Sequence, residues 1–588
     1  MEYINRLEQI IPIDRQQLLE HNFFELYPFD GGGSHINNEI MGTVDDALIA
    51  KKLLNENILR PWGSLPQLDF ARLEKWRSIE QSCWINRFYF IAALARHSWK
   101  SHDAGIADIV KKTILHFIKN YPAPKGIDQI QKHVQYVYNI RDNEYNKHTF
   151  EENQLDETDV QYIWFDFQPA SRILHILYAL YFIKDIGVLS ADDAAAINSS
   201  LYEHALLIHT EECNFLKLLK GDNHQSLRGL VLLYAGLYFK GFGLWESFLR
   251  EGARLCRWHA CEDFLSDGVL GEISPSYHCF ELWHLRDAAR LLRQAGMDCS
   301  QIESKLIKAG DFIRSLRQDD GTLPVINDGY ALYADPFLES LGQYAASNGD
   351  RAVRYYENAG IGVAKNQSSY LLFDASLFTG FDSHYHGGKG AFTYWVQNRP
   401  FFVDSGCCSY DHKLFADWYK KPQAHSSLLI DSKGNGELYG VYDWRQHCDV
   451  NCGGWKDESG GLVISAVMTS GVDTWKGVKW TRTLHILEDG MLVIDDTVEN
   501  AAGRQLCFVF NLHPDVRVCR NVEGLILKNN VGLQMRFDSE TVPRVKLDDG
   551  VTFIGQEHKA NCRILAELTG TETVKFKTTI RREICPKA

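Results

Sequence analysis

The spacing of apolar residues divides the chain into two parts. From about Asp45 to about Ala346, apolar residues recur at intervals of three and four, as in segments 73–94 and 171–183, and this periodicity predicts amphipathic helices. Beyond about Gly360 the pattern changes to short runs of β-branched and aromatic residues, each bounded by Gly, Asn or Asp, which are typical of strands. Because the helices come first and the strands follow without alternation, we predict a helical domain and then an antiparallel sandwich.

The length of 588 residues suits two domains better than one. We predict a helical domain over residues 1–360 and a β domain over residues 361–588. Helices that arrive in pairs are typical of a helical solenoid or toroid. The longest apolar runs, Ile173–Ile183 and Gly229–Phe239, are shorter than the about 20 residues that a bilayer requires, so we expect no membrane-spanning helix.

The composition is that of an ordinary globular protein, with 45% apolar and 23% charged residues. A net charge of −14 predicts no general affinity for nucleic acid or anionic lipid, so any polyanionic ligand must be held by local cations. The 14 cysteines are scattered without a CxxC pair, which predicts free thiols. The N-terminal segment lacks the pattern of a secretory signal and predicts a cytoplasmic protein, or a periplasmic or secreted one if a leader has been removed. Composition leaves the oligomeric state open.

Metal-type side chains gather in the first part of the predicted β domain. In an extended segment, residues two apart share a face, so His384 and His386 can point into one site. Asp404 ends one predicted strand and His425 precedes another. Two or three imidazoles with one carboxylate can form a zinc-type coordination sphere with one open position. Hydrogen-bonded structural histidines explain the pattern equally well, because the chain has 22 histidines and His-x-His has low specificity.

Two predicted helix N-termini carry candidates for proton transfer. Asp222 or Asn223 matches an N-cap and places His224 in the first turn, where the macrodipole favours the neutral imidazole. Ser274 matches a second N-cap, followed by a proline and by Tyr277 in the first turn, where the dipole and nearby cations favour the phenolate. Simple capping and packing explain each segment alone. Together with the His-rich segment, the two openings indicate anion recognition beside proton transfer.

Carboxylates support a competing interpretation. Helical toroids also carry glycoside hydrolases, which need two acids flanking the scissile bond, and Glu272 and Asp328 could form such a pair. Nothing in their setting selects them from the 76 acidic residues. The Gly-rich segments lack the phosphate-loop spacing, and the chain has no Gly-x-Ser-x-Gly elbow at a helical turn, so neither nucleotide binding nor a hydrolase of that kind is predicted.

At the Asn-His, Ser-Pro-x-Tyr-His and His-x-His motifs, the chain resembles the heparinase II/III-like polysaccharide lyases, from about Asp69 onward. The resemblance implies an α+β multidomain protein with an N-terminal α/α toroid and a C-terminal antiparallel β-sandwich. It also implies a carbon-oxygen lyase that cleaves a uronic-acid-containing polysaccharide by β-elimination, with a glycosaminoglycan such as heparan sulfate as the first expectation. The alternatives are an alginate or bacterial exopolysaccharide lyase, and a glycoside hydrolase or a non-catalytic glycan-binding protein on the same scaffold.

The resemblance implies roles for individual residues, with an acidic polysaccharide or oligosaccharide as the partner and no nucleic acid or membrane. Two positions depart from the family pattern, since Gly388 stands where an acidic residue is usual and Ser426-Ser427 where Asn-Thr is usual. Lys389 adds local positive charge. The assignments are Asn223, His224, Tyr277, His384 and Tyr410 as catalytic residues, Arg172 and Lys389 as substrate-binding residues, and His386, Asp404 and His425 as ligands of a divalent metal, expected to be zinc in a structural role.

Overall fold

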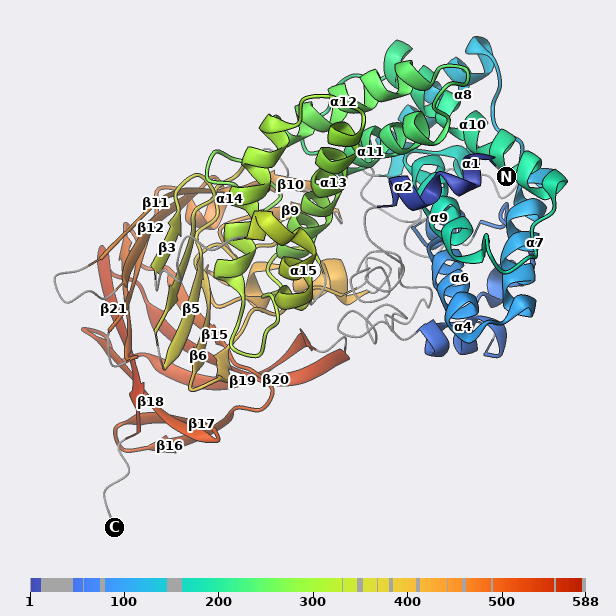
Figure 1. Ribbon diagram of the computed structural model, residues 1–588. Helices are drawn as coiled ribbons and strands as arrows, with labels where there is room; N and C mark the ends of the chain where they lie inside the picture. The colour runs from blue at the N-terminus through green and yellow to red at the C-terminus, as the bar shows by residue number, and fades with distance from the viewer. Residues whose placement is uncertain are drawn as a thin grey trace.

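The long helices precede the three large sheets, and the two parts lie side by side (Figure 1). No helix in the described part of the chain is long and apolar enough to cross a membrane. The computed structural model describes residues 2–11, 46–56, 58–73, 80–144, 161–329, 332–345, 353–366, 368–379, 384–408, 413–440, 443–456, 462–487, 490–554 and 557–583.

The helical part is an arc of paired helices around a buried centre (Figure 1). Helix α9 is buried on every side over its whole length, as expected for a helix that is apolar all round. The helices are α1 (Glu2–Asn5), α2 (Leu7–Ile10), α4 (Asp46–Leu54), α5 (Glu80–Arg87), α6 (Tyr89–Ser101), α7 (Ala104–Asn120), α8 (Ile127–Glu144), α9 (Gln168–Ile183), α10 (Ala191–Asn214), α11 (Asn223–Tyr238), α12 (Trp245–Glu262), α13 (Pro275–Gln294), α14 (Ser300–Leu316) and α15 (Ala334–Leu341).

Helices α11 and α12 pack with their backbones in close approach. A Cβ atom at Gly252 would lie 2.7 Å from the carbonyl oxygen of Gly229, and one at Gly229 would lie 2.7 Å from Leu255 Cβ. Only glycine permits this separation, because any side chain would force the helices apart. The contact therefore fixes the position of α11, whose first turn carries Asn223 and His224.

Three antiparallel sheets form most of the second part. The five-stranded sheet comprises β3 (Val353–Tyr356), β4 (Ile361–Lys365), β5 (Ser369–Asp374), β6 (Ala391–Val396) and β7 (Arg399–Phe402). The four-stranded sheet has the order β19 (Arg544–Ile554), β20 (Glu557–Thr569), β15 (Gln505–Asn511) and β8 (Leu428–Ile430). The eight-stranded sheet has the order β11 (Cys448–Lys456), β12 (Leu462–Ser470), β13 (Lys479–Ile486), β14 (Leu492–Glu499), β21 (Thr573–Arg582), β18 (Val531–Ser539), β17 (Gly524–Asn529) and β16 (Arg517–Asn521). Two short hairpins pair β1 (Gly63–Ser64) with β2 (Gln67–Leu68) and β9 (Glu437–Tyr439) with β10 (Asp443–Gln446).

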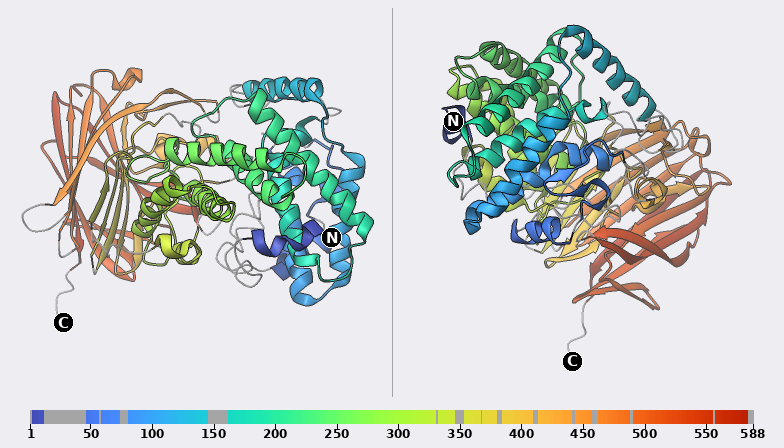
Figure 2. Two further views of the ribbon diagram at one scale, coloured as in Figure 1. Left: turned by 45° about the horizontal axis from the view of Figure 1, so that its top comes forward. Right: turned by 90° about the vertical axis from the view of Figure 1, so that its right-hand side faces the viewer.

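The five-stranded sheet is buried on both faces, between the sandwich core and the helices (Figure 2). Along β5, Leu371 and Phe373 join the sandwich core, while Tyr370 and Leu372 join the core of the helical part. The Tyr370 hydroxyl donates a hydrogen bond to the Leu316 carbonyl at the end of α14. Alternate residues of the strand thus pack on the sandwich core and on the helices. This packing holds the sheet against the helices and brings loops of the β part to their ends.

The predicted fold class is confirmed, since a helical part is followed by packed antiparallel sheets. The transition falls between α15, which ends at Leu341, and β3, which begins at Val353. Strand β3 pairs with β4, so the first strand of the five-stranded sheet lies before the predicted boundary at residue 360.

Candidate functional site

The first turn of α11 has the predicted cap. Asp222 is the N-cap, and its Oδ1 accepts hydrogen bonds from the backbone N–H groups of His224 and Gln225, both at 3.1 Å. Asn223 is the first residue of the helix, and its Nδ2 donates to Glu272 Oε1 at 3.2 Å. The cap therefore fixes Asn223 and His224 at the positive end of the helix dipole.

The first turn of α13 also agrees with its prediction. Ser274 is the N-cap, and its Oγ accepts a hydrogen bond from the Tyr277 N–H. The preceding Ile273 has φ +52°, a left-handed conformation that costs a β-branched residue about 1–3 kcal/mol. A hydrogen bond from Asn327 Nδ2 to the Ile273 carbonyl, at 2.8 Å, helps to hold it. This sharp turn lets Glu272 and Tyr277 approach the same site from one loop.

Glu272 joins three of the predicted catalytic residues. Its Oε1 accepts the bond from Asn223, and its Oε2 forms an ion pair with His384 Nδ1 at 3.0 Å. The His384 ring stacks on the Tyr277 ring, with centroids 4.1 Å apart and planes 24° apart. The structure thus brings Asn223, Tyr277 and His384 together from two helix openings and a loop of the β part.

The ion pair sets the charge of His384. Burial lowers the pKa of this imidazole, but the charge of Glu272, with a smaller contribution from Asp328, outweighs burial and raises the pKa above its usual value. The raised pKa favours the imidazolium form of His384, and this ring lies face to face with the Tyr277 phenol.

His224 is held by a carboxylate that the sequence did not reveal. Its Nδ1 lies 2.5 Å from Asp166 Oδ2, and its ring packs on Phe167 with centroids 4.0 Å apart. Asp166 itself has φ +58°, which turns the chain just before α9. Because Nδ1 is used by Asp166, Nε2 is the atom that His224 can present to a ligand.

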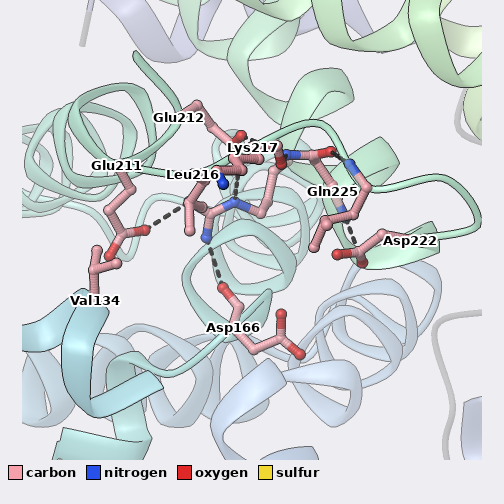
Figure 3. Close-up of a pocket in the computed structure, with 10 residues that line it drawn as sticks. Val134, Asp166, Glu211, Glu212, Leu216, Lys217, Asp222 and Gln225 are labelled. Carbon is pink, nitrogen blue, oxygen red and sulfur yellow. Dashed lines mark hydrogen bonds and ion pairs between the residues drawn. The ribbon is translucent and has the colours of Figure 1, made fainter. Parts of the chain in front are cut away.

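A small cavity is lined by Asp166 together with Glu211, Glu212 and Arg228 (Figure 3). The Arg228 guanidinium forms buried ion pairs with Glu211 and Glu212, and its Nη1 donates to the Asp166 carbonyl at 2.8 Å. The cavity has a volume of about 30 Å³, room for a water molecule and too little for a sugar. The network therefore positions Asp166 and, through it, His224.

The predicted metal ligands lie close together, and the centroids of the His386 and His425 rings are 5.7 Å apart. His425 Nδ1 lies 2.8 Å from Asp404 Oδ2, and His425 Nε2 lies 2.9 Å from the Tyr419 carbonyl oxygen. With Nε2 donating to that carbonyl, Nδ1 is the ring nitrogen that faces the Asp404 carboxylate. Burial lowers the pKa of His425, but Asp404 outweighs burial and raises it. Asp404 and His425 form a buried pair, and their role as metal ligands stays a prediction.

His386, the third predicted ligand, contacts a further carboxylate. Its Nε2 lies 2.7 Å from Asp328 Oδ1, and burial lowers its pKa, which keeps the imidazole neutral. Cys407 Sγ lies 3.8 Å from the same oxygen. Within the described ranges, Asp328, His386 and Cys407 are the one group of three His, Cys, Asp or Glu donors that lie within 4.8 Å of one another.

The predicted substrate-binding cations are buried elsewhere. Arg172 is fully buried in α9, where its Nη1 donates to the carbonyls of Asn86 and Ile163 and burial lowers its pKa. Because α9 is covered on all sides, no face of the helix can point Arg172 toward a ligand. Lys389 is also buried, with its Nζ bonded to Ser376 Oγ. Tyr410 lies outside the described residues.

The sequence alone did not reveal the roles of three acidic residues. Glu272 and Asp328 were weighed as a hydrolase pair, yet each is paired with a histidine. Asp166 was not considered, although it precedes an aromatic residue and the proline that opens α9. A search for carboxylates next to helix starts would have found Asp166 and Glu272, without showing which histidine each one contacts.

The fold and the site define a class: a helical toroid joined to a β-sandwich, with Asn, Tyr and two His side chains where the parts meet. Two family models match the chain, "Heparinase II/III N-terminus" over residues 17–356 and "Heparinase II/III-like, C-terminal" over residues 348–581. The chain therefore belongs to the heparinase II/III-like family, as predicted.

Individual relatives are distant. A heparin-sulfate lyase of Bacteroides thetaiotaomicron is 21% identical over 398 residues, which cover 58% of this chain and 52% of the relative, so the match spans about half the length of that protein. A crystal structure of heparinase III superposes with a TM-score of 0.70 and 15% identity, covering 98% of this chain and 86% of that one. The heparan sulfate lyase HepC of Pedobacter heparinus gives a TM-score of 0.58 and 13% identity over 100% and 88% of the two chains. These structures share the fold.

Proposed function

We propose that the protein is a polysaccharide lyase that cleaves a uronic-acid-containing glycan by β-elimination, with heparan sulfate as its first substrate class. Family membership and the heparin-sulfate lyase among its relatives support the reaction and the substrate. The observation that carries the proposal is the stack of Tyr277 on His384, joined to Asn223 through Glu272.

The difficult step in such a reaction is removal of the C5 proton, because the carbanion adds charge to a carboxylate that is already negative. Asn223 uses one N–H for Glu272 and keeps the other for the substrate carboxylate. His224 would turn its Nε2 toward that carboxylate while Asp166 holds Nδ1. One such donor stabilises the developing charge by about 3–4 kcal/mol.

Proton transfer would be the task of Tyr277. The cationic His384 ring favours its phenolate, which takes the C5 proton. The C5–H electron pair then forms the C4=C5 double bond as the C4–O4 bond breaks. Tyr277 returns the proton to O4, so the tyrosine ends as it began and no water is consumed.

The hydrolase alternative is weakened by the same contacts. Glu272 is 2% exposed and engaged by Asn223 and His384, while Asp328 is fully buried against His386. A glycoside hydrolase needs both carboxyl groups at the sugar, one on each side of the bond. These two acids position histidines instead.

The test is incubation with heparan sulfate, alginate and bacterial exopolysaccharides while ultraviolet absorbance and reducing ends are recorded. A lyase produces both signals, because its product is a conjugated unsaturated uronate. Tyr277→Phe should lower the absorbance rate by about 10²–10⁴-fold, while Tyr333→Phe, at an exposed tyrosine, should leave it unchanged. Reducing ends without absorbance would instead support a hydrolase, and binding without either signal a glycan-binding protein. Signal from alginate or an exopolysaccharide alone would replace heparan sulfate as the substrate. The cytoplasmic location stays a prediction.

A further inference from the structure

A buried hydrogen bond joins the two helices that carry Asn223 and Tyr277. Ser226 Oγ, on α11, donates to Glu281 Oε2, on α13, at 2.6 Å. The same Oγ lies 3.1 Å from His284 Nδ1, about one turn further along α13. Ser226, Glu281 and His284 are each at most 2% exposed. Because water has no access to these groups, solvent cannot replace a partner that is removed.

The contact lies just behind the candidate active site. Ser226 follows Asn223 by three residues and Glu281 follows Tyr277 by four, so each shares a helix face with the catalytic candidate one turn before it. At a rise of about 1.5 Å per residue, the contact lies roughly 5–6 Å along each helix from that candidate. The separation of α11 and α13 at this point therefore governs how far Asn223 lies from Tyr277.

The chemistry of the contact suits a fixed link between helices. Burial raises the pKa of the Glu281 carboxyl well above its usual range, and Asp263 adds to this shift, so the group is neutral. Burial lowers the pKa of His284 to about 3, so its imidazole is neutral as well. Glu281 Oε1 lies 3.3 Å from His284 Nδ1. The helices are thus joined without a further negative charge close to the site that must accept the carboxylate of a uronate.

A second hydrogen bond between the same two helices lies far from the site. The Tyr234 hydroxyl, on α11, donates to Asp287 Oδ2, on α13, at 2.8 Å, and both residues are fully buried. Tyr234 is 11 residues beyond Asn223 and Asp287 is 10 residues beyond Tyr277, which corresponds to about 15–17 Å along each helix. The two contacts show that α11 and α13 run side by side in the same direction. The contact of Ser226 is the one of the two that lies near the helix openings.

We propose that Ser226 and Glu281 are positioning residues, whose hydrogen bond holds the first turn of α11 against α13 and so sets the distance between Asn223 and Tyr277. The role rests on the proposed function, because Asn223 and Tyr277 would act on one uronate ring. Asn223 binds the carboxylate on which charge grows, while Tyr277 removes the C5 proton. A misplacement of about 1 Å between such groups can lower the rate about 100-fold.

The test compares deletions of single oxygen atoms in the full-length protein by steady-state lyase kinetics. Ser226→Ala removes the donor and should lower kcat by about 10–100-fold with little change in KM, because the lost alignment matters in the transition state. Tyr234→Phe is the matched control, since it also removes one oxygen from a buried hydrogen bond between α11 and α13, and it should leave kcat unchanged. Glu281→Gln keeps an oxygen for Ser226 and gains an N–H for His284, so it should retain most of the wild-type kcat.

The wild type separates a failure of this role from a failure of the proposed function. A wild type that yields no unsaturated uronate refutes the proposed function and the positioning role with it. Where the wild type is active, an unchanged kcat in Ser226→Ala, or an equal loss in Tyr234→Phe, would make the contact ordinary helix packing and overturn the inference. If Ser226→Ala does not fold by circular dichroism, Glu281→Leu breaks the same contact and repeats the test. Failure of both variants to fold would also overturn the inference, because the contact would then be a requirement of the fold.

Discussion

Replacement of Glu272 by glutamine isolates the effect of its charge on His384. Glutamine keeps the size of the side chain and an oxygen that can accept the Asn223 N–H, so the 3.2 Å hydrogen bond from Asn223 can be kept. The 3.0 Å ion pair with His384 Nδ1 is lost, because glutamine carries no charge. The variant therefore tests whether His384 acts as a cation.

The size of the effect follows from that distance. Two unit charges 3.0 Å apart interact by about 5 kcal/mol at an effective dielectric constant of about 20. Burial of His384 opposes this attraction, and the attraction prevails, so Glu272 raises the pKa of His384. Without Glu272, burial dominates and the pKa of His384 falls below its usual value of about 6.5.

The assay is the pH profile of kcat/KM from the ultraviolet absorbance of the product. Activity that needs cationic His384 is lost as the pH rises through the pKa of His384, so Glu272→Gln should move the alkaline limb to lower pH. The raised pKa also stabilises the fold below about pH 6.5, and this contribution is lost as the pH rises through the raised value. The variant should therefore be destabilised more at about pH 6 than in alkaline solution.

An unchanged alkaline limb, with only a uniform loss of rate, would refute the electrostatic role and leave Glu272 as a packing residue. Glu246→Gln, at an exposed carboxylate on α12, is the control and should change neither the profile nor the stability.

Two further predictions concern the other carboxylate–histidine pairs. Asp166→Asn should lower kcat/KM by about 100-fold, because His224 loses the acceptor that orients its ring. The control is Asp185→Asn, at an exposed carboxylate, which should leave kcat/KM unchanged. Equal values for the two variants would show that Asp166 has no role in the site. Asp404→Asn should cost about 3–5 kcal/mol in urea unfolding, because it leaves the His425 imidazolium buried without a counter-charge. Burial raises the pKa of Asp404, but His425 outweighs burial and lowers it, so the stabilisation from Asp404 is lost as the pH falls through this lowered pKa. The pKa of His425 is raised, so the stabilisation from His425 is lost as the pH rises through that raised pKa. The difference in unfolding free energy between the wild type and Asp404→Asn should thus be largest between about pH 4 and 6.5. A difference below about 1 kcal/mol in this range would contradict the prediction.

Local features of the fold and site could be predicted from the sequence. The caps at Asp222 and Ser274 act on N–H groups two or three residues away, so the information lies within one turn. The change of hydrophobic period near residue 360 likewise places helices before strands. Such signals identify which helix openings carry Asn223 and Tyr277.

Long-range partners could not be predicted in the same way. Asn223 and Glu272 are 49 residues apart, and Asp166 and His224 are 58 residues apart, so no local spacing links them. The burial of Arg172 could not be predicted for another reason. Every residue of α9 is buried, so the sequence of this helix has no polar face that would indicate which side chain reaches a ligand.

Four histidines of the site region show why a carboxylate neighbour does not by itself define a role. His224 and His384 keep 26% and 17% of their side-chain surface exposed, while His386 and His425 keep 1% each. An acid beside an exposed imidazole sets its charge and orientation for a ligand, whereas an acid beside a buried one chiefly compensates for lost hydration. Access to solvent therefore separates the catalytic candidates from the structural ones, and no motif in the sequence states it. The pairs are Asp166 with His224, Glu272 with His384, Asp328 with His386, and Asp404 with His425.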